Sequence, residues 1–574
     1  MDVIDRLWYD AGMYLRTTRR RNGDGTEVRY LSLAHNEWDA GAGRSKVRIL
    51  FNFGREDGLD PAAIRRLISS LSRALPPDEA LAAAAAPELR FLESRPLGGA
   101  WLLDGLWARL GLGEILARLL RGRRLDPAAE RALFAMVANR ALAPSSKVSC
   151  AAWVSERATI PGLEALSDDA CYRAMDWLTE IEPALAEQVY WSVANLLNLE
   201  VDLLFFDTTS TYFETDAADP PSDGAPAGFR TYNGHSKDHR PDLPQVVIGL
   251  AVTRTGIPIR VWTFPGNTAD MALIRQVKDD LRAPKLGRVV WVTDRGFSSA
   301  ENRRYLQRAG GHYISGEKLR GESAEAKAAL ARQGRYQVVA GNLEVKEVVL
   351  DEGVMRDRFV VCRNPDEAVR DAAIRDRLVG QLEAAIAGSD ELDSAARATL
   401  ACDLRAKPTN RRFLRITTAG LLRIDRAAVA ADAKLDGKFL LRTSDPTLSA
   451  ADVATGYKQL LEVERGWRDM KTTLDLRPVY HRKEQRIRAH VLLCWLALLL
   501  IRLAEQATGD TWRNLRFELE KCHLGRFVGP AGEVAQRTEL TSRQVAIFKA
   551  AEVAEPPRYV RVATPQAAPA TVTG

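Results

Sequence analysis

The sequence predicts a mixed α/β protein, with a small β unit at the N-terminus and an all-α segment before the main sheet. Residues 97–199 carry apolar side chains at helical spacing, as in "WLLDGLWARLGLGEILARLL". Strand-like and helical segments then follow in the order β-β-β-α-β-α-β between residues 200 and 319, which indicates a mixed sheet covered by helices. Because 574 residues exceed what one hydrophobic core can serve, we expect several domains.

Composition narrows the class of protein. The net charge of +6 comes from 81 basic and 75 acidic residues, so only local clustering of basic residues could argue for a nucleic-acid partner. Six scattered cysteines without a CxxC pair fit neither a disulfide framework nor a structural zinc site, and they indicate a reducing cytoplasm. The start, "MDVIDRLWYD", shows no signal-peptide pattern. The longest apolar run, 491–501, is too short to span a bilayer, so we expect a buried helix and no membrane partner.

The N-terminal region is expected to be a β unit followed by a helix and a linker. "KVRILFNF" alternates apolar and polar residues, and "RRNGDGTEVRYL" contains a hairpin turn signal. Four arginines cluster at that hairpin: Arg16, Arg19, Arg20 and Arg21. Two interpretations of this cluster stay open, a solvated loop and a contact with a DNA backbone. "EALAAAAAPEL" (79–89) is a low-complexity connector.

We expect six segments along the chain. They are the N-terminal unit (1–95), the all-α domain (96–199), the first part of the sheet domain (200–319), an insertion (320–445), the end of the sheet domain (446–510) and a C-terminal region (511–574). The end of the sheet domain should hold a long helix from about Ala450 to Leu474 and an apolar helix from about Arg486 to Glu505. The last residues, "ATPQAAPATVTG", are predicted to be disordered.

Two aspartates follow apolar strand-like runs. Asp207 comes directly after "LLFF", and Asp294 after "VVWVT". A carboxylate beside a buried apolar run is unfavourable unless its charge is compensated. Since each Asp ends an apolar strand, we expect both carboxylates at one edge of the sheet. The alternative is that each is an ordinary turn or cap residue.

A third carboxylate is predicted on the helix that contains "YKQLLEVERGWRDMKTTL". At about 100° per residue, one face of a single helix would carry Tyr457, Leu460, Glu464, Trp467 and Lys471. Glu462 would then point to the other side. The alternative role of Glu464 is a surface ion pair with Arg468 at i, i+4.

Together these motifs resemble those of a known family. "DTTSTYFE", "VTDRGF" and the spacing of Tyr457, Leu460, Glu464 and Lys471 are similar to the carboxylate motifs of DDE transposases of bacterial insertion sequences. The similarity points to the insertion-sequence-four superfamily and its sixteen-thirty-four branch. It extends to "HSKDHRPDLPQVVIGL", "PGNTAD", "YISGEKLR", "DGKFLLRTSD" and "RPVYHR", in that order, and covers roughly residues 100 to 505. Leu460 departs from the family signature, which has Arg there.

The resemblance implies a ribonuclease-H-like catalytic core with a mainly β insertion. It assigns catalytic and metal-binding roles to Asp207, Asp294 and Glu464, holding two Mg²⁺ or Mn²⁺ ions, for which carboxylates are suitable hard ligands. The implied activity is cut-and-paste transposition, with cleavage at the element's ends, a hairpin step and joining of the 3′ ends to target DNA. The implied partners are terminal inverted repeats, target DNA and a second copy of the chain, at the nucleoid of a bacterial cytoplasm.

Basic residues cluster in "RPVYHRKEQRIRAH" (477–490), just beyond the predicted catalytic helix. Such a cluster suits contact with DNA phosphates, although a solvated basic face is the alternative. The candidate DNA-binding residues here and in the loop "YNGHSKDHRPD" are Tyr457, Lys471, Arg468, Arg477, His481, Arg482, Lys483, Arg486, Lys237 and Arg240. His481 and His490 match no common spacing of metal ligands.

Two other functions stay open at this point. A glycoside hydrolase also uses paired carboxylates, but it does not need a third one on a basic helix. A transposase relic that binds DNA without cutting it would keep the same motifs.

Overall fold

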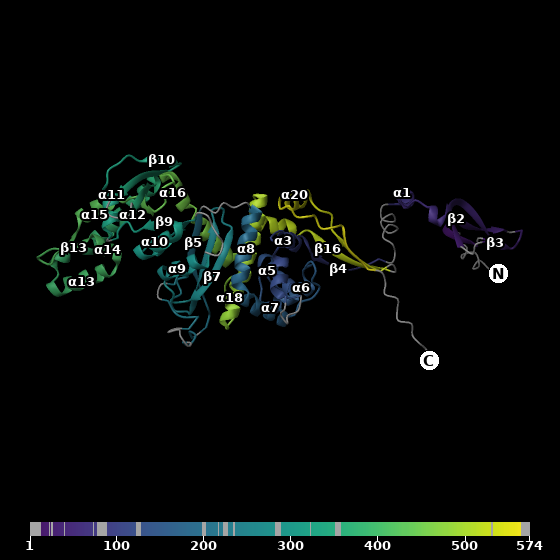
Figure 1. The fold of residues 1–574 in the computed structure, drawn as a ribbon, viewed down its shortest axis with the longest axis horizontal. Coiled ribbons are helices and arrows are strands. Elements are labelled where there is room, and N and C mark those ends of the chain that lie inside the picture. The colour runs from purple at the N-terminus through teal and green to yellow at the C-terminus, as the bar shows by residue number, and fades with distance from the viewer. Residues whose placement is uncertain are drawn as a thin grey trace. The chain divides into compact units, whose positions relative to one another are not determined.

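Figure 1 shows the computed structural model of the chain, which divides into two compact units. The first comprises residues 1–93, 526–535 and 561–574, and the second comprises residues 94–525 and 536–560. The structure describes residues 13–563 except 22, 24–26, 40, 73, 77–88, 122–127, 198–202, 216, 222–227, 234–235, 282–288, 322, 351–356 and 530–531. The predicted connector (79–89) and the predicted disordered end therefore lie, but for one residue each, outside the described residues.

The second unit contains a nine-stranded mixed sheet, in the order β10-β11-β12-β15-β9-β8-β5-β6-β7, of which β10, β9, β5 and β7 are labelled in Figure 1. Its strands are β5 (Leu203–Tyr212), β6 (Gln245–Thr253), β7 (Pro258–Pro265), β8 (Val290–Thr293), β9 (His312–Glu317), β10 (Gln337–Ala340), β11 (Leu343–Leu350), β12 (Asp357–Arg363) and β15 (Lys438–Thr443). β5 pairs antiparallel with β6 and parallel with β8. It is therefore the central strand of the five-stranded half β7-β6-β5-β8-β9, as the resemblance implies for the strand that carries the first aspartate.

Helices cover both faces of this sheet because its central strands are apolar on both sides. The covering helices are α9 (Asp270–Asp280), α10 (Ala300–Gln307), α16 (Ala450–Lys458), α17 (Leu461–Thr472) and α18 (Glu484–Thr508). Phe205 and Val292 share one hydrophobic core with apolar residues of α16, α17 and α18. Phe206 and Trp291 share a second core with apolar residues of α9 and α10 on the other face. Residues of β5 with odd numbers thus face α16–α18.

The apolar run at 491–501 is part of α18, and the predicted buried helix is confirmed: every residue of the run is buried. By length and composition α18 could cross a membrane, but it packs inside the protein against the sheet and against the helices of the all-α segment. Those helices are α3 (Gly98–Arg109), α4 (Leu112–Leu120), α5 (Ala129–Leu142), α6 (Lys147–Glu156), α7 (Asp168–Glu180) and α8 (Glu182–Leu197).

The segment 320–445 differs from the expected mainly β insertion. Its strands β10, β11, β12 and β15 extend the main sheet beyond β9, and only a short β13–β14 pair (Leu414–Ile416 and Leu422–Ile424) stands apart. Its helices cover more residues than its strands: α11 (Ala324–Ala331), α12 (Pro365–Ile386), α13 (Ser394–Ala406), α14 (Pro408–Phe413) and α15 (Arg426–Ala433). Capping residues such as Asn364 and Asp393 begin two of them. The insertion is thus mixed α/β.

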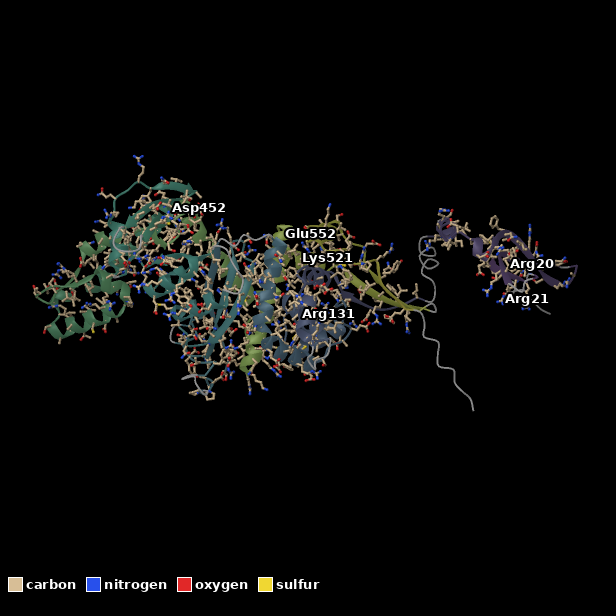
Figure 2. The ribbon with its side chains drawn as sticks, in the orientation of Figure 1. Arg20, Arg21, Arg131, Asp452, Lys521 and Glu552 are labelled. Carbon is tan, nitrogen blue, oxygen red and sulfur yellow. The ribbon has the colours of Figure 1, made fainter. Side chains whose placement is uncertain are left out.

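The first unit contains a three-stranded antiparallel sheet. Its strands are β1 (Tyr14–Arg21), β2 (Glu27–Asp39) and β3 (Arg44–Arg55), followed by α1 (Pro61–Ser72). Arg20 and Arg21 are exposed on β1 (Figure 2), so they are free to meet solvent or a phosphate backbone.

The C-terminal elements complete the chain. They are α19 (Trp512–Leu519), α20 (Ser542–Ala550) and the strands β16 (His523–Gly529), β17 (Gly532–Arg537) and β18 (Tyr559–Ala563). These three strands form a sheet with β4 (Arg90–Pro96) in the order β18-β17-β16-β4.

Candidate active site

Asp207 lies within β5, not at its end as predicted. The strand continues through Thr208 to Tyr212, and this hydroxyl-rich stretch pairs with β6. Threonine favours strands through its branched Cβ, so the end of the apolar run did not mark the end of the strand. The neighbouring strand β8 does end there: Phe206 is opposite Thr293, the last residue of β8. Asp207 is therefore the first residue of β5 beyond the end of its parallel neighbour.

Asp294 comes directly after β8. The two aspartates therefore each follow the last paired residues, Phe206 and Thr293, of two adjacent parallel strands. Asp207 shares the face of Phe205, and Asp294 that of Val292, which is the face covered by α16–α18. The hydroxyl of Tyr457 on α16 donates a hydrogen bond of 2.9 Å to Oδ1 of Asp294. Burial and the Asp294 carboxylate raise the pKa of Tyr457, which keeps this donor protonated.

The charge of Asp207 is poorly compensated. Burial is the main cause that raises its pKa to about 6; Lys237 opposes this rise, and the carboxylates of Asp270 and Asp294 add to it. Nζ of Lys237 lies 3.7 Å from Oδ1 of Asp207 and 3.2 Å from Oδ2 of Asp270. Sequence reasoning placed Lys237 among the DNA contacts and missed Asp270. Asp270 is the first residue of α9, where an acidic residue is common for helix reasons alone.

Glu464 is exposed on α17, and its side chain makes no hydrogen bond or ion pair with the residues that the structure describes. The predicted single helix from Ala450 to Leu474 is wrong, because α16 ends at Lys458 and α17 begins at Leu461. Between them the amides of Gln459 and Leu460 bond to carbonyls three residues back, which tightens the turn. Rotation angles counted along one helix therefore do not apply across this turn.

α17 nevertheless crosses the sheet beside Asp207. A Cβ on Gly466 would stand 3.1 Å from a methyl carbon of Leu250, and Leu250 is the residue of β6 opposite Asp207. The alternative ion pair between Glu464 and Arg468 is not formed among the described residues. Glu464 is thus a free carboxylate on the helix that covers the aspartates.

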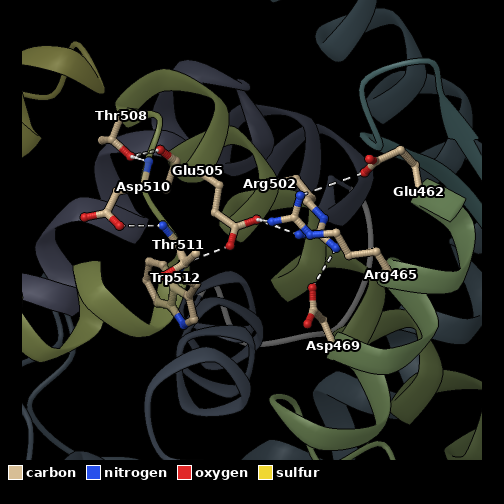
Figure 3. A network of polar contacts seen from close by, with 10 residues as sticks. Glu462, Arg465, Asp469, Arg502, Glu505, Thr508, Asp510, Thr511 and Trp512 are labelled. Carbon is tan, nitrogen blue, oxygen red and sulfur yellow. Dashed lines mark hydrogen bonds and ion pairs between the residues drawn. The ribbon is translucent and has the colours of Figure 1, made fainter. Parts of the chain in front are cut away.

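A buried ionic network fixes α17 on α18 (Figure 3). Arg502 of α18 bonds Asp469 of α17 at 2.6 Å and Glu505 at 2.5 Å. Arg465 of α17 also reaches Glu505, at 3.2 Å, and lies 4.0 Å from Glu462. Glu462 therefore belongs to this network.

A second buried ionic cluster lies at the C-terminal end of α17. Oδ1 of Asp238 accepts from Nζ of Lys471 at 2.7 Å and lies 2.9 Å from the guanidinium of Arg477. The side chain of Asp238 is only 4% exposed, and its Oδ2 is buried without a hydrogen-bond partner among the described residues. Burial lowers the pKa of Lys471, while Asp238 opposes this. The loop that supplies Lys237 to the aspartates thus supplies Asp238, its neighbour, to the cations of α17 and the segment after it.

The family described as "Transposase DDE domain" matches residues 205–500, just over half of the chain, including both aspartates and Glu464. The chain belongs to the DDE transposase family. The family described as "IS1634 family transposase, N-terminal domain" matches residues 15–82, so the predicted branch is confirmed. These matches establish a DNA transposase, and the predicted mixed α/β fold class is confirmed by the sheet and its covering helices.

No curated protein matches the transposase in sequence. One similar solved structure is described as "Cryo-EM structure of piggyBac transposase synaptic complex with hairpin DNA (SNHP)". It is 11% identical, with a TM-score of 0.33, over 74% of this chain and 78% of that chain.

The position at which the transposase departs from the family signature is part of the core. Leu460 is 9% exposed and packs in the same hydrophobic core as Phe205 and Val292. Its side chain therefore has a packing role in place of the phosphate contact expected of an arginine.

The candidate DNA-binding residues fall into two groups. Arg468, Arg482 and Lys483 are exposed and make no side-chain hydrogen bond or ion pair with any described residue. The others already have partners within the transposase: Lys237, Lys471 and Arg477 as above, Tyr457 with Asp294, Arg486 with Asp176, Arg240 with Asp242, and His481 with the rings of Tyr172 and His490.

His481 makes the stability of the transposase sensitive to acid. Burial, with nearby Lys147 and Arg486, lowers the pKa of His481 to about 4, so its ring is neutral near pH 7. The unfolded chain takes up this proton near pH 6.5, so stability is lost as the pH falls from about 6.5 towards 4. We expect the fall in Tm between pH 7 and pH 5 to be smaller for His481→Gln than for the wild type. Equal falls would contradict the assignment of a buried neutral ring.

Proposed function

We propose that this transposase cleaves DNA at the ends of an insertion sequence and joins the freed 3′ ends to target DNA by cut-and-paste transposition. The observation that carries the proposal is the placement of Asp207 and Asp294 as neighbours on two parallel strands, beneath the helix that bears Glu464. Phosphodiester transfer needs this kind of oxygen-rich anionic site.

The residues present fit divalent cations. Carboxylate oxygens are hard ligands suited to Mg²⁺ or Mn²⁺, and Asp207 stands among carboxylates that one lysine only partly neutralises. Asp207, Asp294 and Glu464 would hold these ions. When bound, two such ions activate the attacking oxygen and stabilise the departing one.

The described carboxylates do not form a closed metal site in this structure. Within the described ranges, no three Asp, Glu, His or Cys side chains lie close enough together to hold a metal ion. Glu464 is the side chain free to complete the set, because it is exposed and forms no side-chain hydrogen bond or ion pair with the part of the chain that the structure describes. Tyr457 holds Asp294 in place through its 2.9 Å hydrogen bond.

A basic cavity beside Asp294 suits the DNA backbone. The cavity of about 550 Å³ is bounded by Asp294 and Tyr457. Four basic residues also line it: Arg295, Lys318, Arg320 and Lys438. Cations here and at Arg468 would bind phosphates by charge neutralisation and hold the scissile strand against the aspartates.

The proposal extends to partners and place. Two ends must be brought together, so we propose a homodimer that pairs them, acting on DNA at the bacterial nucleoid in the cytoplasm. We leave out the hairpin step, because Leu460 is buried where the family signature has Arg.

The experiment is an end-cleavage assay on a DNA fragment that carries the inverted repeats flanking the gene. With Mg²⁺ or Mn²⁺ we expect nicks that leave 3′-hydroxyl groups at the repeat ends, and we expect none with EDTA or with scrambled repeats. Binding to the repeats without cleavage would support the rival reading of a catalytically silent relic. Cleavage that is unchanged by EDTA would overturn the metal-dependent mechanism.

A further inference from the structure

The loop between β5 and β6 places a lysine among the proposed metal ligands. Nζ of Lys237 lies within ion-pair distance of both Asp207 and Asp270. We propose that Lys237 is the transposase's own counter-cation for these carboxylates, and that a divalent cation must displace it from Asp207. The inference rests on the proposed function, since it concerns the same carboxylates.

The contact is held from several directions. Nζ of Lys237 donates to the carbonyl oxygen of Thr208 at 2.8 Å and to its hydroxyl at 2.6 Å. The hydroxyl of Thr208 in turn donates to Oδ1 of Asp270 at 2.6 Å. Thr208 and Asp270 thus fix the ammonium group at the point where β8 has ended and Asp207 has no parallel neighbour.

Charge explains why the lysine is there. Asp207 and Asp270 share one ammonium group, and Asp294 follows the adjacent parallel strand directly beside Asp207, so three like-charged carboxylates lie near one another and repel. Lys237 is the cation that opposes this effect at Asp207. In the absence of metal it therefore stabilises the folded site. It also lowers the affinity for a divalent cation, because the ion must enter beside a like charge and replace its ion pair.

Asp270 has a different part in the exchange. Unlike Asp294, it does not follow β8. It is the first residue of α9, and its carboxylate lies on the α9 side of the sheet. When Lys237 leaves Asp207, Asp270 and the carbonyl of Thr208 can retain the ammonium group nearby. We therefore assign Asp270 as a positioning residue that keeps Lys237 available without making it a ligand.

The test measures metal binding without DNA, by melting curves and calorimetry over a range of Mn²⁺ concentrations at fixed pH. We expect Lys237→Gln to lower the Tm of the metal-free protein and to reduce the half-saturating Mn²⁺ concentration by about tenfold. Asp270→Asn should do the opposite to binding, because Lys237 then pairs with Asp207 alone. Arg240→Gln is the matched control: it removes a cation from the same loop, but Arg240 pairs with Asp242 and not with these carboxylates.

The outcomes separate this inference from the function on which it rests. A half-saturating concentration for Lys237→Gln that equals or exceeds that of the wild type would overturn it, and so would an equal gain for Arg240→Gln. With either of these results, a wild type that is stabilised by Mn²⁺ would still support the proposed metal site. A wild type with no response to Mn²⁺ would overturn the metal site and this inference together.

Discussion

Replacing Glu464 by Gln is expected to abolish DNA strand cleavage while leaving the transposase as stable as the wild type. If Glu464 is the third metal ligand, its loss should lower the cleavage rate by about 10³-fold or more, as removal of one member of a catalytic set does. Because the side chain is exposed and free of contacts with the described residues, the change in unfolding free energy should stay within about 0.5 kcal/mol. Single-turnover cleavage and thermal melting check the two parts.

Four further variants test how the carboxylates are used. Asp207→Asn and Asp294→Asn should lose cleavage as Glu464→Gln does. Glu462→Gln should keep it, because Glu462 belongs to the network with Arg465. Should Asp270→Asn lose cleavage while Glu464→Gln keeps it, Asp270 would be the third ligand and the assignment of Glu464 would be wrong.

Replacing Asp238 by Ala is expected to give the largest loss of stability among the polar substitutions considered. The variant leaves Lys471 and Arg477 without the carboxylate that pairs with both, and Lys471 is mostly buried. Breaking a buried ion pair from one side costs about 3–5 kcal/mol, because a charge is left uncompensated. The measurement is the urea midpoint of unfolding.

Asp242→Ala is the control for this variant. Asp242 pairs with Arg240 through a bidentate contact at 2.8–2.9 Å, but both side chains are exposed. A surface pair contributes about 0–1 kcal/mol, so its loss should barely move the midpoint. If Asp238→Ala and Asp242→Ala moved the midpoint equally, the buried cluster would not stabilise the fold.

The two aspartates could be proposed from the sequence because each follows an apolar run, and a carboxylate beside a buried strand is unfavourable unless it has a function. The choice of Glu464 over Glu462 rested on an incomplete reason and stays a prediction. The helix arithmetic assumed a continuous helix, whereas the tight turn at Gln459 and Leu460 separates Tyr457 from Glu464. Neither of those two positions is proline or glycine, so the sequence gives no signal of the turn.

The contacts that could not be predicted from the sequence join segments that lie far apart along the chain. Lys237 meets Asp207 across 30 positions, and Asp238 meets Lys471 across 233 positions. Neither pairing leaves a periodic pattern, since each depends on where a loop is placed by the sheet. Helix start signals in the insertion can be recognised in the sequence. The pairing of its strand β15 with β9 cannot, because it depends on a sheet edge that exists only after the sheet has folded.

The joining of β15 to β9 has a consequence for biogenesis. The five-stranded half of the sheet is complete once β9 has been synthesised, but its β9 edge stays open until β15 emerges about 120 residues later. At about 5–20 residues per second, a ribosome leaves this edge exposed for roughly 6 to 25 s. An unpaired strand edge is a template for aggregation. Nascent chains on neighbouring ribosomes are therefore most vulnerable to mutual pairing during this interval, and slowing translation between residues 318 and 437 should lower the yield of soluble transposase.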